Sequence, residues 1–197
     1  MPKAKPDLNL NPDDLLTAEY EYISSTVFQA NEDRSRVASF YFVSVGSIVA
    51  AILGIQFGPE KIQSVAPAFS ILFIFLTILG ALTLAQLARL RAAWHESVQA
   101  MNQLKDFYIK IHPDIAPAFK WRGKTIPPTD KPFSIANLTA FEVTLLGALT
   151  TAAAVYFILL TFNINILPWG WTVIIAFFII SGRLQWNFYK KHLVDDR

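Results

Sequence analysis

The sequence offers few side chains whose type and spacing could do chemistry. His95-Glu96 begins like the zinc-binding HExxH helix, but Gln99 stands where the second histidine is needed. His112 and His192 have no companions suited to a metal site. The chain has no cysteine, which excludes disulfides, thiolate catalysis and cysteine-based metal or iron–sulfur sites. These residues predict no cofactor and no metal site.

Other enzymatic patterns are equally weak. Arg89 and His95 have a spacing loosely similar to the Arg–His motif of HEPN ribonucleases, but that pattern is very permissive. The sequence has no glycine-rich phosphate loop and no nucleophile elbow. Its net charge of +2 is too small to indicate nucleic-acid binding. We therefore expect a protein that is not an enzyme and has no nucleic-acid partner.

Glu142 and Arg183 are the ionisable residues with the most unusual placement, because each lies near the edge of an apolar stretch. Ionisable groups in membrane segments usually face the protein interior and find a partner. An antiparallel hairpin would bring these two to the same depth. We predict a Glu142–Arg183 ion pair with a structural role. The alternative is that each side chain extends to the interface separately.

Four apolar stretches must position these residues: Val37–Phe57, Ala66–Ala88, Leu138–Phe162 and Leu167–Gly182. The chain is 53% hydrophobic and 16% charged, against roughly 25% charged in soluble domains. The first three stretches can cross a hydrocarbon core of about 30 Å as helices. The fourth is short and crosses only if Arg183 extends to the interface; the alternative is three spans and a re-entrant end. We predict an all-α integral membrane protein with four transmembrane helices in two antiparallel hairpins.

The distribution of positive charge orients these spans. Of the 17 lysines and arginines, Lys61 is the only one placed on the outer side. The positive-inside rule therefore puts the N- and C-termini in the cytoplasm of a multi-pass protein of the cytoplasmic (inner) membrane. The residues before Val37 are polar and lack the apolar core of a secretory signal, so the first span is expected to act as an uncleaved insertion signal.

This topology predicts five segments. They are a cytoplasmic arm with an amphipathic helix (1–36), a transmembrane hairpin (37–88), a cytoplasmic helix extension with a Pro-rich basic loop (89–134), a second transmembrane hairpin (135–189) and a cytoplasmic tail (190–197). Asn11 followed by Pro12 is typical of a helix start. An apolar stripe after the second span predicts one helix from Ala68 to about Ile111, against which the N-terminal helix packs.

The Pro-rich segment contains basic and aromatic residues that could face the membrane: Lys120, Trp121, Arg122, Lys124 and Lys131. Each lysine or arginine near an anionic lipid surface contributes about 1 kcal/mol to binding. These five are candidates for binding lipid headgroups. The simpler interpretation, which we favour, is a positive-inside loop that lies close to the membrane.

Small residues mark two faces where helices could pack closely. Gly46, Ala50 and Gly54 recur every four residues in the first span, and Gly147 and Thr151 do the same in the third. Such spacing lets backbones approach in lipid, where packing drives helix association. The sequence does not separate contacts within one subunit from contacts between subunits.

The chain resembles two families of bacterial membrane proteins. The run Asn31–Arg36 followed by Ser39-Phe40-Tyr41 resembles the entry to the first hairpin of SLATT and RipA-like proteins. The long helix with Trp94 and Tyr108, and the entry Leu138–Glu142, look more like the RipA type. The resemblance implies an octameric cytoplasmic-membrane protein of unclear activity, or, for SLATT proteins, a pore-forming effector. Neither family supplies an active site.

Three functions stay open. The leading one is a homo-oligomeric scaffold with a cytoplasmic helical collar, whose partners are membrane lipids and copies of itself. The second is a pore-forming or channel-like effector gated from the cytoplasm by a protein or a small-molecule signal. Ser39, Ser44 and Ser47 supply only a partial polar stripe for such a path. The third is a small subunit of a larger membrane complex.

Overall fold

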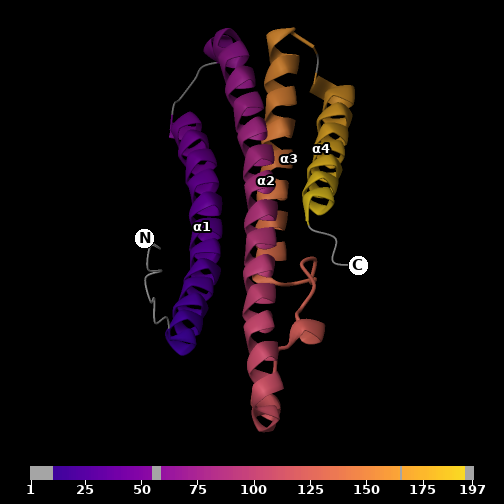
Figure 1. The fold of residues 1–197 in the computed structure, drawn as a ribbon. Coiled ribbons are helices and arrows are strands. Elements are labelled where there is room, and N and C mark those ends of the chain that lie inside the picture. The colour runs from indigo at the N-terminus through magenta and orange to yellow at the C-terminus, as the bar shows by residue number, and fades with distance from the viewer. Residues whose placement is uncertain (1–10, 55–58, 165, 194–197) are drawn as a thin grey trace, which may run out of the picture. The chain divides into compact units, whose positions relative to one another are not determined.

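A computed structural model describes residues 11–54, 59–164 and 166–193. Within these ranges the chain is helical and contains no strand. Four α-helices carry the fold (Figure 1): α1 (Pro12–Gly54), α2 (Pro59–Ile111), α3 (Ile135–Thr161) and α4 (Trp171–His192). Short segments lie between them: the 3-10 helices η1 (Pro113–Ala118) and η2 (Gly123–Thr125) follow α2, and the π-type segment η3 (Ile166–Gly170) precedes α4.

Three of these helices, α1, α2 and α3, are long and apolar enough to cross a membrane. This confirms the predicted all-α class and gives three candidate membrane-spanning helices among the described residues. The fourth predicted span is not among the three.

Helix α1 begins where the sequence predicts. The side-chain oxygen of Asn11 accepts a hydrogen bond from the backbone N–H of Asp13 at 3.2 Å, which satisfies one of the unpaired donors of the first turn. Pro12 is the only proline of α1 and occupies its first position, where a missing N–H costs nothing. The helix continues without a break for 43 residues and includes most of the first apolar stretch.

Helix α2 is longer than predicted: it begins at Pro59, whereas the sequence predicted a start near Ala68. It ends at Ile111, as predicted. The helix ends there because Pro113 disfavours a helical conformation at the residue before it, His112. His112 accordingly has φ −127° and ψ 81°.

The stretch Leu167–Gly182 is not one continuous helix. Leu167 has φ −103° and ψ 130°, outside the helical region. Pro168 follows it and pushes the preceding residue toward an extended backbone. Helix α4 starts only at Trp171, so the apolar α-helical part before Arg183 is about 18 Å long.

The described chain packs as two compact units. Unit 1 combines the start of α1, up to Asn31, with residues 93–127. There Ile23 is buried, and the hydroxyl of Thr26 lies 3.1 Å from that of Ser97 on α2. The described part of unit 2 comprises residues 32–54, 59–92, 128–164 and 166–193. Its core includes Tyr41, Leu76, Leu84, Val143 and Tyr189, and α3 lies beside α4 within it (Figure 1).

Candidate functional site: a buried polar chain

A chain of polar side chains crosses the core of unit 2 and joins three helices. The hydroxyl of Thr77 on α2 lies 3.0 Å from that of Thr150 and 3.4 Å from that of Thr151, both on α3. The Thr151 hydroxyl lies 2.7 Å from that of Ser181 on α4. The amide nitrogen of Gln185 donates to the Ser181 hydroxyl at 3.0 Å. These contacts fix α2, α3 and α4 at one register.

The threonines are held by their own helices. The Thr77 hydroxyl lies 2.9 Å from the carbonyl of Phe73, and those of Thr150 and Thr151 each lie 2.9 Å from the carbonyl of Gly147. A hydroxyl has one proton but two lone pairs. A threonine that donates to a carbonyl of its own helix can still accept a hydrogen bond from a neighbouring helix.

Gln185 is the last residue of the polar chain and lies against Gly147. Its side chain is buried, and its Oε1 has no hydrogen-bond partner among the described residues. A Cβ at Gly147 would overlap the Gln185 amide. Glycine at this position therefore lets α3 come close to Gln185 on α4 without displacing its side chain.

Tyr41 brings α1 into the same core. Its side chain is fully buried and faces Thr150. A Cβ at Gly80 on α2 would lie 2.6 Å from the Tyr41 hydroxyl oxygen, closer than real Cβ atoms approach. Gly80 thus leaves the space that the Tyr41 ring fills, and all four α-helices of unit 2 contact one polar core.

Two arginines and a tyrosine form a second polar cluster in unit 2. The Arg91 guanidinium donates from Nε to the carbonyl of Thr129 at 3.1 Å and from Nη2 to that of Pro128 at 3.3 Å. This ties the end of the Pro-rich segment to α2. Tyr189 is buried, and the positive charges of Arg91 and Arg34 act on its side chain. Burial lowers the pKa of Arg34.

The polar chain has the chemistry of a structural element. It contains hydroxyls and one amide but no carboxylate or imidazole, so no member titrates near neutral pH. Over the described residues, no group of three or more His, Cys, Asp or Glu side chains is arranged to hold a metal ion. Hydrogen bonds between membrane helices average about 0.6 kcal/mol each. The polar chain therefore adds modest stability and holds α2, α3 and α4 in a specific register.

Among the described residues, the structure records no ion pair between Glu142 and Arg183, and both side chains are exposed. A recorded ion pair joins Arg36 to Asp33 at 3.5 Å, one turn apart on α1. The contact between Glu142 and Arg183 stays a prediction.

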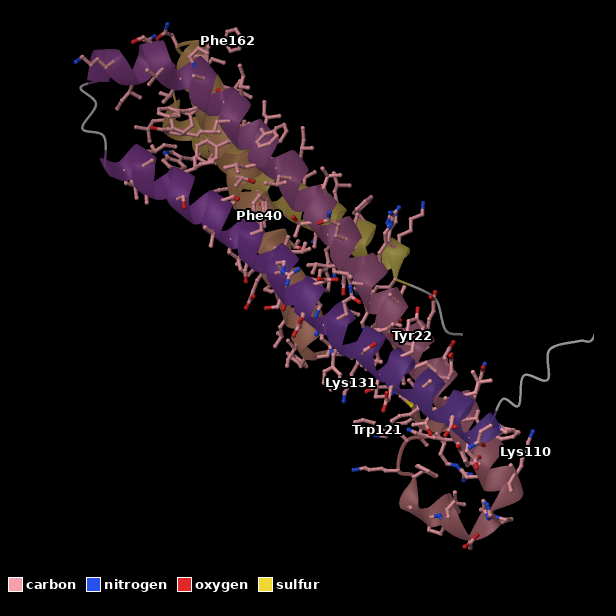
Figure 2. The ribbon with its side chains drawn as sticks, turned by 60° about the vertical axis from the view of Figure 1, so that its left-hand side comes forward. Tyr22, Phe40, Lys110, Trp121, Lys131 and Phe162 are labelled. Carbon is pink, nitrogen blue, oxygen red and sulfur yellow. The ribbon has the colours of Figure 1, made fainter. Side chains whose placement is uncertain are left out.

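The basic residues of the Pro-rich segment are mostly exposed. Lys120, Trp121 and Lys131 are exposed, and Arg122 is half-buried. Trp121 and Lys131 can be followed in Figure 2. The side chain of Lys124 lies outside the described residues. Exposure suits either a loop near the membrane or lipid binding, so both interpretations stay open.

The structure distinguishes the two small-residue faces. Gly147 and Thr151 face the core of unit 2, where Gln185 and Ser181 contact them. Gly46, Ala50 and Gly54 are exposed on α1. No atom outside helix α1 lies within 4 Å of a Cβ built at Gly46 or Gly54. The α1 face therefore has no partner within the described chain.

Sequence reasoning missed most of the polar chain. Thr77, Ser181 and Gln185 are single polar residues in or beside apolar stretches of different helices, with no motif to connect them. One available signal was that isolated polar residues in membrane helices tend to hydrogen-bond across helices. The role of Arg91 was missed too, because its carbonyl partners lie far away in sequence.

Comparison of the chain with protein-family models, curated proteins and solved structures finds no match. The resemblance to RipA-like and SLATT proteins thus stays a prediction.

Proposed function

We propose that this chain is a homo-oligomeric membrane scaffold that crosses the cytoplasmic membrane four times. Helix α4 serves as the fourth span in this proposal. It packs against α3 and ends in Lys190, Lys191 and His192, which suit the cytoplasmic interface. Lys61 as the lone basic residue of the outer side supports cytoplasmic termini.

The observation that carries self-association is the outward face of α1. Gly46, Ala50 and Gly54 form a flat strip on which a second helix could pack closely. Within the described chain nothing occupies it. Since packing replaces hydrophobicity as the driving force in lipid, such a strip favours another protein helix over lipid tails. A second copy of α1 is the simplest occupant.

Exposed apolar side chains in unit 1 support the same proposal. Leu15, Tyr22 and Phe28 on α1 are 61%, 65% and 68% exposed. This proposal places unit 1 in the cytoplasm, where such side chains would face water. Apolar surface of this kind in a water-facing unit is typical of protein contacts. Copies joined along α1 would cover part of it.

Cysteine cross-linking tests the scaffold, because the natural chain contains no cysteine. We expect Ala50→Cys to give a disulfide-linked dimer in membranes. Ile175→Cys on α4, which is 55% exposed, is the matched control and is expected to cross-link weakly. Gly46→Leu should reduce the subunit number measured by light scattering. A stable monomer of the natural chain would overturn the proposal and favour a subunit of a larger complex.

A channel is the second candidate, and one observation favours it. Ser39 and Ser47 are exposed on α1, as are Gly46 and Ala50. A ring of copies with this face inward would line a path with hydroxyls and small residues. In liposomes, Ser47→Cys should then lose ion flux on treatment with a charged thiol reagent. If a purified ring of copies shows no ion flux in liposomes, the channel is ruled out and the scaffold stays as the proposed function.

A further inference from the structure

A groove runs between α3 and α4 on the surface of unit 2. It has a volume of about 480 Å³, within the range of ligand pockets. Its walls are apolar and include Phe141 and Leu145 on α3 and Ile179 on α4. Ala148 and Gly182 form its narrow part, where a Cβ at Gly182 would lie 3.5 Å from that of Ala148.

The charged lining residue of the groove is Arg183. Its side chain is exposed and forms no ion pair within the described residues. Trp186 lines the same groove and packs edge-on against Phe141, with ring centroids 6.0 Å apart. The Lys190 ammonium lies 5.4 Å from the centre of the Trp186 ring. Arg183 and Lys190 are two turns apart on one face of α4, about 10 Å along its axis.

This order of groups matches the order of groups in a phospholipid. The apolar walls suit an acyl chain, the tryptophan suits the membrane–water interface, and the two cations suit a phosphate and an anionic headgroup. We propose that the groove binds one anionic phospholipid, with its acyl chain between α3 and α4 and its headgroup held by Arg183 and Lys190. This site rests on the proposed placement of α4 in the membrane.

Glu142 adds one negative charge beside the groove without cancelling its positive charge. It is exposed on α3 next to Phe141, which lines the groove. In place of the Glu142–Arg183 pair expected from sequence, the guanidinium is then held by a lipid phosphate. Two cations beside one carboxylate still leave a net positive charge for an anionic headgroup.

Quenching of Trp186 fluorescence by brominated lipids tests the site. The probe is the full chain with Trp94, Trp121, Trp169 and Trp171 changed to Phe, in vesicles of phosphatidylglycerol and phosphatidylcholine with one lipid brominated at a time. We expect phosphatidylglycerol to be preferred at Trp186 by at least fivefold, since one cation near the surface is worth about that factor. Arg183→Gln should reduce the preference about fivefold, and Arg183→Lys should keep most of it.

Arg89→Gln provides the matched control. Arg89 is an exposed arginine of unit 2 that does not line the groove, so its loss should leave the preference unchanged. Equal quenching by both brominated lipids would overturn the lipid site while leaving α4 in the membrane. Absence of quenching by either lipid would mean that a second copy covers the groove or that α4 lies outside the membrane. Cross-linking from Ile179→Cys distinguishes these two cases, and either one overturns the lipid site.

A second measurement covers a failure of the four-fold Trp variant to fold. The natural chain in detergent should gain thermal stability from added phosphatidylglycerol and less from phosphatidylcholine, because a ligand that binds only the folded state stabilises it. Arg183→Gln should abolish that difference. An undiminished difference would contradict the site.

Discussion

Changing Gly147 to alanine adds only one methyl group. It should nevertheless weaken the packing of α3 on α4 strongly. The added methyl would overlap the amide of Gln185, which is buried and donates to Ser181. The Gln185 side chain must then move, and because it is buried this movement must displace its neighbours. The substitution therefore tests whether the close approach of these two helices depends on a missing Cβ.

The magnitude follows from three terms. Overpacking a core costs about 1–3 kcal/mol, and loss of the Gln185–Ser181 hydrogen bond costs about 0.6 kcal/mol in a membrane protein. Alanine in place of glycine returns about 0.5–1 kcal/mol of backbone entropy in a helix. We expect a net loss of about 0.6–3 kcal/mol in the free energy of unfolding.

Gly182→Ala is the matched control, since it makes the same change on the facing helix. A Cβ at Gly182 would meet Ala148 at 3.5 Å, an ordinary contact, so this variant should be as stable as the natural chain or slightly more stable. Unfolding in mixed micelles with increasing SDS, followed by circular dichroism, measures both. Gln185→Ala should rescue Gly147→Ala, because it removes the overlapping amide. Equal stability of the two glycine variants would refute the reasoning.

Two further predictions concern other contacts of unit 2. Arg91→Leu should speed limited proteolysis of residues 113–134 at least about tenfold, since hydrogen bonds from a charged group contribute about 1.5–3 kcal/mol; an unchanged cleavage rate would show that other contacts hold this segment. If Glu142 and Arg183 do pair in the assembled protein, exchanging the two residues should recover the stability lost by either charge reversal alone, and no recovery would dismiss the pair.

Several features followed from the sequence because they depend on local chemistry. Asn11 and Pro12 set the start of α1, and Pro113 set the end of α2, since capping and proline geometry act within a few residues. Long apolar stretches likewise identified α1, α2 and α3 as membrane-spanning candidates. The break at Leu167 was also local, because Pro168 stands next to it, but the apolar composition of the stretch concealed it.

Tertiary structure alone decided which side chains meet. Two strips of small residues looked alike in sequence, yet Gly147 lies against Gln185 while Gly46 faces outward. Thr77 and Thr151 carry no motif, and only the relative rotation of α2 and α3 places their hydroxyls together. Hydropathy determines that a helix enters the membrane, but every face of an apolar helix satisfies lipid about equally well. The rotation of each helix is therefore set by close packing and hydrogen bonds with its neighbours, which no single stretch of sequence contains.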